Sequence, residues 1–268
     1  MVRRRVLVTG AMGRVAGQLL PGLRERFDLR LMDRVPGCDA DAGSGLLVGE
    51  LTDHRLLDEA VTGVDAVVHL AGNPDPAASW QQLREPNVEG FAALLAVSGE
   101  RGVRRVIFAS SVHAMGAYEG RRRWPIDPAW PPAPCCSYGA TKAFDEALAR
   151  AYDYRTGMSL IGLRLGLCTA EASATQSVAG WLRPVDLQRV VIGALEADVK
   201  FGVYHAVSWP SRRRWDIDAT ITELGYQPER GDHEPHDQPE PADTFLSTCP
   251  GQRIVEPAQW RAAGEVRT

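Results

Sequence analysis

The sequence predicts an α/β fold with a doubly wound parallel β-sheet, and three features of the 268-residue chain support this prediction. A β-branched run near the N-terminus ends in a glycine-rich turn, and a helical pattern follows it. A second apolar run ends in an acidic residue about 20 positions after the first glycine. Apolar runs and helical patterns then alternate along most of the chain, which is typical of a parallel sheet that helices cover on both faces. We therefore expect a Rossmann-type core with a small C-terminal lobe.

The first strand, turn and helix lie between residues 6 and 23. Val6-Leu7-Val8 has the length of a strand, and the turn Gly10-Ala11-Met12-Gly13 follows it after Thr9. The glycines let the backbone approach a pyrophosphate, while the N-terminus of the next helix offers unpaired N–H groups and the positive end of its dipole. Pro21 interrupts the helical pattern, so we expect a kink or a new start there. The helical pattern consists of Val15, Leu19, Leu20 and Leu23.

The acidic residue is Asp33, at the end of the apolar run Leu29-Arg30-Leu31-Met32. A carboxylate at this position should bind the ribose hydroxyls of a dinucleotide. Further strands are expected at 46–48, 65–72, 105–109, 159–164 and 201–207. Helices are expected at 56–61, 91–97, 138–151 and 184–195, so strands and helices alternate through the predicted core.

Composition restricts the classes of function. The chain has 44% hydrophobic residues and a net charge of −4, which is unlike a disordered chain or a nucleic-acid-binding protein. We find no transmembrane run, and the arginine-rich start lacks the apolar segment of a secretion signal. The five cysteines are odd in number and lack metal-ligand spacing, so we expect reduced thiols in the cytoplasm and no metal site.

The main chemical signal is Tyr138 followed by Lys142, just after the proline-rich segment 131–134. Positions i and i+4 of a helix share a face, so the Lys142 charge should lie close to the Tyr138 hydroxyl. A nearby cation favours phenolate, so we expect the pKa of Tyr138 to fall from about 10 towards neutrality. Tyr138 would then be a general base for a substrate alcohol.

With the glycine turn, Asp33, Ser110-Ser111 and the Tyr138/Lys142 pair in this order, the chain resembles the extended short-chain dehydrogenase/reductases, the NAD-dependent epimerase/dehydratase family. Within the family it is most similar to the uronate dehydrogenases. The resemblance implies an NAD-binding Rossmann core with the Ser/Tyr/Lys site at residues 1–165. Residues 166–268 would hold the rest of the core, a small substrate-binding lobe and a C-terminal tail. The subgroup likeness rests on Phe108-Ala109-Ser110-Ser111-Val112-His113, on residues 163–169 and on Leu224-Gly225-Tyr226-Gln227-Pro228.

The resemblance also implies roles for single residues, with NAD as the cofactor. Ser111 would hydrogen-bond the reacting oxygen, Tyr138 would be the acid/base, and Lys142 would hold the nicotinamide ribose. The implied cofactor-binding residues are Gly10, Met12, Gly13, Arg14, Val15, Asp33, Arg34, Glu50, Leu51, Leu70, Ala71, Gly72, Asn87, Ala109, Tyr138 and Lys142. The implied substrate-binding residues are Asn73, Ser111, Val112, His113, Leu167 and Gln176.

Three positions depart from the uronate dehydrogenase pattern. Val112 stands where those enzymes have Asn, Leu167 where they have Ser, and Gln176 where an Arg clamps the substrate carboxylate. Because buried hydrogen-bonding groups discriminate strongly between substrates, we expect the chemistry to be shared and the substrate to differ from a simple uronate. Arg183 or the cluster Arg212-Arg213-Arg214 could still supply a cation from another loop.

We therefore predict an NAD-dependent oxidoreductase that transfers a hydride between nicotinamide and a hydroxyl or carbonyl of a sugar-like small molecule. A nucleotide-sugar epimerase or dehydratase uses the same triad, and a non-catalytic dinucleotide sensor shares the fold, so both are alternatives. We expect a cytoplasmic enzyme with no nucleic-acid or membrane partner. A homo-oligomer is an open alternative to a monomer.

Overall fold

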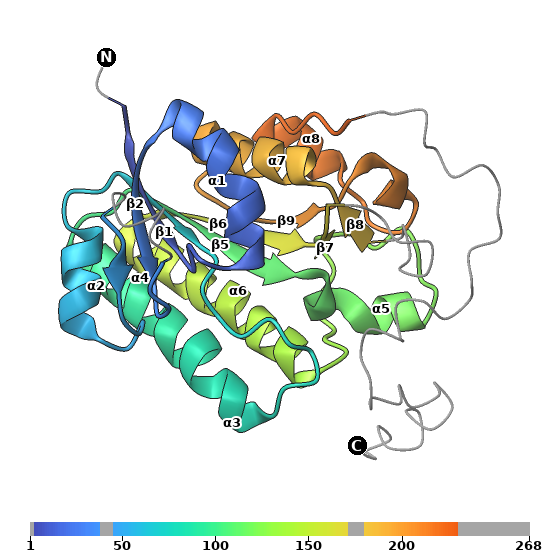
Figure 1. Cartoon of the computed structure of the whole chain (residues 1–268). Helices are drawn as coiled ribbons and strands as arrows, with labels where there is room; N and C mark the ends of the chain where they lie inside the picture. The colour runs from blue at the N-terminus through green and yellow to red at the C-terminus, as the bar shows by residue number, and fades with distance from the viewer. Residues whose placement is uncertain (1–2, 38–44, 171–179, 230–268) are drawn as a thin grey trace.

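The computed structural model describes residues 3–37, 45–170 and 180–229. Its centre is a seven-stranded sheet in which every strand is parallel to its neighbours, in the order β3-β2-β1-β4-β5-β6-β9 (Figure 1). The predicted parallel α/β fold is therefore confirmed. The strands are β1 (Arg5–Thr9), β2 (Asp28–Asp33), β3 (Leu47–Val48), β4 (Ala66–His69), β5 (Arg105–Ser111), β6 (Ser159–Leu165) and β9 (Phe201–Ala206).

Helices cover both faces of this sheet (Figure 1). One face carries α1 (Arg14–Arg26), α7 (Pro184–Glu196) and α8 (Asp218–Leu224). The other face carries α2 (His54–Val61), α4 (Gly90–Glu100) and α6 (Ser137–Thr156).

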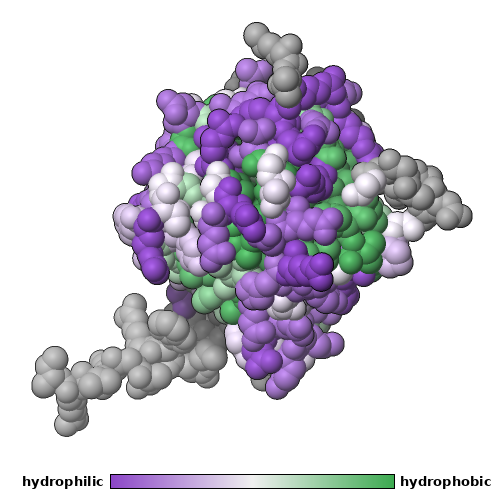
Figure 2. All heavy atoms as spheres, turned by 90° about the vertical axis from the view of Figure 1, so that its left-hand side faces the viewer, coloured by the Kyte–Doolittle hydropathy of each residue, from purple (hydrophilic) through white to green (hydrophobic). Residues whose placement is uncertain are grey.

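Each buried strand serves both apolar cores because successive side chains point to opposite faces. In β1, Val6 and Val8 belong to the core beneath α1 and α7, whereas Leu7 belongs to the core beneath α2 and α4. In β4, Val68 belongs to the core beneath α1 and α7, and Val67 belongs to the core beneath α2 and α4. This explains why the strands are continuous apolar runs in the sequence. Figure 2 shows the surface on the left-hand side of Figure 1, which is mostly hydrophilic with apolar areas between the polar side chains.

The chain changes direction in the sheet at β1, which has β2 on one side and β4 on the other. The loops that follow β1 and β4 therefore run to different sides, and they leave a crevice at the carboxyl ends of these two strands. In open α/β sheets this crevice is where ligands bind.

Short elements surround the carboxyl ends of β5, β6 and β9, where α5, β7 and β8 lie in Figure 1. β7 and β8 form a separate two-stranded parallel sheet. The short elements of this region are a 3₁₀ turn (Val112–Met115), α5 (Gly116–Gly120), β7 (Leu167–Cys168), β8 (Trp181–Leu182) and a second 3₁₀ turn (Trp209–Arg213). Two further short elements, α3 (Trp80–Leu83) and a π-helical segment (Arg84–Glu89), lead into α4.

Of the two alternatives expected at Pro21, a kink or a new start of the helix, the new start is not found. The helix does not begin again at Pro21 but runs through it from Arg14 to Arg26. Proline removes the N–H that would bond the carbonyl of Gly17, and both residues are exposed, so water can satisfy that carbonyl.

No helix within the described ranges is long and apolar enough to cross a membrane.

Candidate active site

A groove follows the crevice between β1 and β4, and it gathers most of the residues expected to bind the cofactor. The glycine turn forms one wall, the end of β2 and the segment 49–52 close one end, and the loop after β4 forms the other wall. The expected residues that line this groove are Gly10, Met12, Gly13, Arg14, Val15, Asp33, Arg34, Glu50, Leu51, Leu70, Ala71 and Gly72.

The glycine turn fits a dinucleotide pyrophosphate. Gly10 has a φ of +71°, and a Cβ at this residue would lie 2.6 Å from the backbone nitrogen of Ala71, so only glycine lets the turn approach the loop after β4. α1 starts after Gly13, which provides no side-chain cap, and its first turn contains no acidic residue. The first N–H groups of a helix have no partner within the helix, so they can bind a phosphate together with the positive dipole end.

Asp33, the last residue of β2, connects this strand to the glycine turn. One carboxylate oxygen accepts a hydrogen bond from the Met12 N–H at 2.9 Å, and the other accepts one from the Val35 N–H at 3.0 Å. Each oxygen keeps a further lone pair, so the same carboxylate can accept bonds from ribose hydroxyls. Arg34 lies beside it on the groove wall.

A second hollow joins the groove, because both are lined by Arg14, Val15 and the segment 70–74. Ser111, Tyr138 and Lys142 all line it, as does Ala109, so the structure brings the expected catalytic residues to one place. Five of the six residues expected to bind substrate also line it, and Gln176 lies outside the described residues. These five are Asn73, Ser111, Val112, His113 and Leu167.

The start of α6 explains how Tyr138 reaches this hollow. Cys136 is the N-cap, and its sulfur accepts a hydrogen bond from the Gly139 N–H at 3.3 Å. Gly139 packs directly on the 3₁₀ turn after β5, since a Cβ there would lie 2.3 Å from the carbonyl oxygen of His113. This close contact brings the N-terminus of α6 against the end of β5, where Ser111 lies.

The pKa of Tyr138 differs from the sequence-based expectation. Burial raises it above its ordinary value, while the Lys142 ammonium and a hydrogen bond from Ser111 act in the opposite direction without reversing the shift. The predicted fall towards neutrality is therefore wrong for the protein without cofactor. The prediction included the charge of Lys142 but not the desolvation of the phenol, which lies against the hollow wall.

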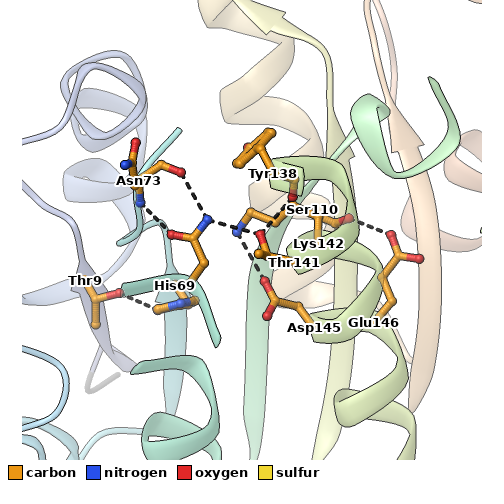
Figure 3. A network of polar contacts seen from close by, with 10 residues as sticks. Thr9, His69, Asn73, Ser110, Tyr138, Thr141, Lys142, Asp145 and Glu146 are labelled. Atoms are coloured by element: carbon orange, nitrogen blue, oxygen red, sulfur yellow. Dashed lines mark hydrogen bonds and ion pairs between the residues drawn. The ribbon is translucent and has the colours of Figure 1, made fainter. Parts of the chain in front are cut away.

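A buried carboxylate pairs with the catalytic lysine. Lys142 Nζ lies 3.2 Å from Asp145 Oδ2, and both side chains are almost fully buried (Figure 3). Burial lowers the pKa of Lys142, but the Asp145 carboxylate and the Tyr138 phenol outweigh it, so the net shift is upward. Burial also raises the pKa of Asp145, to about 6, even though Lys142 opposes the rise. The pair is an ammonium and a carboxylate at neutral pH.

A second ionic group lies behind the pair. Ser110 donates a hydrogen bond of 2.5 Å to Glu146 (Figure 3). Glu146 also binds the buried Arg164 through both carboxylate oxygens, at 2.9 and 2.8 Å. A bidentate carboxylate–guanidinium pair has a fixed geometry, so it ties α6 to β6. Ser110 precedes Ser111, and this bond therefore anchors the end of β5 beside the hollow.

Asn87, which the resemblance places behind the site, is buried and holds the backbone of another residue. Its Oδ1 accepts a hydrogen bond from the Asn73 N–H at 2.7 Å, and its Nδ2 donates to the Asn73 carbonyl at 3.1 Å and to Thr141 Oγ1 at 3.2 Å. Thr141 in turn donates to the Tyr138 carbonyl (Figure 3). Asn87 thus joins the loop after β4 to α6 across the two halves of the site, rather than lining the groove.

Of the arginines suggested as alternative substrate cations, Arg183, Arg213 and Arg214 do not line the hollow, and the side chain of Arg212 lies outside the described part of the structure. Arg183 pairs with Glu229 at 3.0 Å and lies against the Trp181 ring. Arg214 pairs with the buried Glu119 and stacks on the Trp124 ring. Arg213 is exposed at the end of the second 3₁₀ turn. Of the basic residues that the structure describes, Arg14, His113 and Lys142 line the hollow.

Comparison with known proteins assigns the family. The model of the NAD-dependent epimerase/dehydratase family matches residues 6–192. The chain belongs to this family. It is 32% identical over 256 residues to the NAD-dependent glucose-6-phosphate dehydrogenase of Haloferax volcanii. This alignment covers 89% of this chain and 98% of the relative. The uronate dehydrogenase of Pseudomonas putida is 31% identical over 84% of this chain and 83% of its own.

The solved structures agree with this family. The crystal structure of uronate dehydrogenase from Agrobacterium tumefaciens superposes with a TM-score of 0.79 at 27% identity, over 90% of this chain and 92% of that chain. These comparisons confirm the predicted family, NAD as the cofactor and the class of sugar oxidoreductase.

Sequence reasoning missed three features of the site. Asp145 lies three residues after Lys142 on α6, a spacing that indicates contact between a carboxylate and an ammonium. The link between Asn73 and Thr141 through Asn87 carried no comparable local signal. The third feature is the contact of His113 with Cys135 and Cys136, which lie 22 and 23 residues further along the chain.

Proposed function

We propose that this protein is an NAD-dependent dehydrogenase that oxidises a hydroxyl of a neutral, sugar-like molecule in the hollow formed by Ser111, Tyr138 and Lys142. The observation that carries the proposal is the continuity of this hollow with the groove along the glycine turn. A dinucleotide bound across the crevice would place its reactive ring beside all three side chains.

In the proposed mechanism, Tyr138 takes the proton of the substrate hydroxyl while Ser111 hydrogen-bonds the same oxygen. NAD, when bound, supplies the hydride acceptor. Lys142 favours the phenolate form of Tyr138 by its charge, and Asp145 balances that charge within a buried environment. Gly10, Gly13 and the start of α1 would hold the pyrophosphate, and Asp33 would hold the adenosine ribose.

The walls of the hollow support a neutral substrate. Val112, Leu165 and Leu167 contribute apolar surface near Ser111. Lys142 is already paired with Asp145, and Arg14 lies at the start of α1, where the pyrophosphate is proposed to bind. A carboxylate taken out of water needs its own paired cation, preferably a bidentate one. We therefore propose a sugar-like alcohol with fewer hydroxyls or with an alkyl group, rather than a free uronate.

The substrate is to be found by a screen of sugars, sugar acids, sugar phosphates and cyclitols for NAD reduction, followed at the absorbance of reduced nicotinamide. Tyr138→Phe then tests the mechanism with the best substrate. This variant keeps the ring and removes the proton acceptor, so turnover should fall at least about 100-fold while NAD still binds. Near-normal turnover with bound cofactor would refute the proposed role.

Tyr154→Phe is the matched control for this experiment. Tyr154 lies on the same helix, but its side chain is 75% exposed and far along α6 from the hollow. Loss of its hydroxyl should leave turnover unchanged.

A further inference from the structure

One imidazole and two thiols meet at the edge of the hollow. His113 lies in the 3₁₀ turn after β5, while Cys135 and Cys136 end the loop that leads into α6. His113 Nδ1 lies 3.4 Å from the Cys135 sulfur and 3.5 Å from the Cys136 sulfur. The two sulfurs are 3.9 Å apart.

These three separations match one face of a tetrahedral metal site. Zinc binds thiolate sulfur at about 2.3 Å and imidazole nitrogen at about 2.0–2.1 Å, in tetrahedral geometry. Such a site has its two sulfurs about 3.8 Å apart and its nitrogen about 3.5 Å from each sulfur. The observed distances of 3.9, 3.4 and 3.5 Å agree within the tolerance of about 0.2 Å that a plausible metal site allows.

We propose that His113, Cys135 and Cys136 form a binding site for a thiophilic d¹⁰ cation such as Zn²⁺, with water in the fourth position. Two thiolates and one imidazole are a donor set that selects soft or borderline cations over Mg²⁺ and Ca²⁺. Binding converts two thiols into two metal–sulfur bonds and releases two protons, so charge and atoms balance without any oxidant.

The surroundings favour negative charge on one of the sulfurs. Cys136 caps the N-terminus of α6, a helix of 20 residues, and its sulfur accepts the Gly139 N–H at 3.3 Å. The positive end of a helix dipole stabilises a thiolate. Outer hydrogen bonds of this kind also orient metal ligands. The Cys135 thiol donates to the His113 carbonyl at 3.8 Å when it is protonated, so the site is ordered without a cation as well.

The site also has an entry path and a link to the active site. His113 lines the hollow, so a hydrated cation can reach the ring from the hollow. Its ring meets the Tyr138 ring edge to face, with the centroids 5.6 Å apart. Cation binding uses none of Ser111, Tyr138 and Lys142, so it can be measured separately from turnover, and it does not depend on the proposed substrate.

The test uses the full chain with Cys38→Ser and Cys249→Ser, which removes the two cysteines outside the described residues. The reduced, chelator-treated protein is titrated with Cd²⁺ as a spectroscopic probe and with Zn²⁺ in competition. We expect one equivalent bound per chain, a thiolate-to-Cd²⁺ charge-transfer band and the release of two protons. Cys135→Ser and Cys136→Ser should each weaken binding at least about 100-fold, since loss of even an outer-shell partner costs 10–100-fold.

Cys168→Ser is the matched control. Cys168 is a buried thiol that also lines the hollow, but burial raises its pKa to about 12 and it lies outside the cluster. This substitution should leave Cd²⁺ binding unchanged.

Several results would overturn the proposal. They are absence of binding in the parent protein, or equal affinity in Cys135→Ser. Circular dichroism shows whether each variant folds. If a serine variant does not fold, alkylation of the parent decides the question instead. Bound Cd²⁺ should protect Cys135 and Cys136, identified by mass spectrometry, and equal labelling with and without Cd²⁺ would contradict the site.

Discussion

At the scale of single residues, the Lys142 ammonium lies between two groups whose ionisation it affects, the Tyr138 phenol and the Asp145 carboxylate. Burial is the main cause of the raised pKa of Tyr138, and Lys142 opposes it. The Asp145 carboxylate acts in the same direction as burial, because a second negative charge disfavours phenolate. Asp145 therefore stabilises the buried lysine and at the same time weakens its effect on the tyrosine.

Asp145→Asn should shift the pH profile of oxidation to lower pH. The pKa of Asp145 is about 6, so the residue is ionised in the alkaline range where Tyr138 titrates. Removing that charge lowers the pKa of Tyr138, and the phenolate forms at lower pH. The measurement is kcat/KM for substrate oxidation against pH, with Asp145→Glu as the variant that restores the charge. An unchanged ascending limb, on the acid side of the profile, in Asp145→Asn would contradict the argument.

Asp33 should make the enzyme prefer NAD over NADP. Its carboxylate can accept bonds from the ribose hydroxyls but would repel a 2′-phosphate, whereas Arg34 beside it could pair with that phosphate. We expect kcat/KM to favour NAD by at least about tenfold, a difference of about 1.4 kcal/mol.

Asp33→Asn and Arg34→Ala separate the two effects. Asn keeps an acceptor for the Met12 N–H and removes the charge together with the acceptor for the Val35 N–H, so the preference for NAD should narrow. Arg34→Ala should widen it, because the cation that favours NADP is lost. Comparable efficiency with both cofactors in the parent enzyme would show that Arg34 dominates.

At the scale of elements, the turn between β1 and α1 depends on backbone rather than side-chain chemistry. Gly10 has a positive φ and packs against the loop after β4, so the crevice has its shape only with glycine there. Gly17 lies on the exposed side of α1, where a Cβ would meet nothing within 4 Å. The two glycines of the same β–α unit therefore have opposite consequences when replaced by alanine.

Gly10→Ala should weaken NAD binding and lower the unfolding temperature. The left-handed backbone costs about 1–2 kcal/mol for alanine, and the contact of 2.6 Å with Ala71 forces the two loops apart. Gly17→Ala is the control, and it should stabilise the protein by about 0.5–1 kcal/mol with unchanged NAD affinity. Thermal unfolding and NAD titration measure both effects. Equal NAD affinity in the two variants would contradict this account of the turn.

At the scale of the whole molecule, most of the sheet could be predicted because its strands are buried on both faces. β1, β4, β5 and β6 are continuous apolar runs, and glycines or polar residues mark their ends. The short elements were missed, because two-residue strands such as β7 and β8 carry no periodicity. A new start of α1 at Pro21 was one of two predicted alternatives, and the helix does not have it, since an exposed helix position tolerates a missing N–H bond.

The candidate site, like the fold, could be predicted only in part. Tyr138 and Lys142 could be placed together because they lie at helical spacing, whereas the role of Ser111 came from the family resemblance. The desolvation of Tyr138 could not be predicted, since it depends on residues that are distant in the sequence. The meeting of His113 with Cys135 and Cys136 depends on the path of the loop between β5 and α6, which no local pattern describes.

Free glucuronate and galacturonate should be poor substrates, although uronate dehydrogenases are among the relatives. Among the described cations that line the hollow, Lys142 already pairs with Asp145, and Arg14 lies at the proposed pyrophosphate site. Gln176, which replaces the substrate-binding Arg of the uronate dehydrogenase pattern, carries no charge. Val112 and Leu167 offer no partner to sugar hydroxyls, and an unpaired buried polar group costs about 1–3 kcal/mol.

Steady-state kinetics on glucuronate, beside a neutral sugar of the same ring size, measures this preference. We expect the neutral sugar to have the higher kcat/KM. Leu167→Ser and Val112→Asn together should raise the efficiency on glucuronate, because they restore polar partners on the wall of the hollow. A kcat/KM for glucuronate of about 10⁴ M⁻¹s⁻¹ or above in the parent enzyme lies within the ordinary range for a natural substrate. That result would mean that a cation reaches the carboxylate from outside the described residues, and the proposed neutral substrate would be wrong.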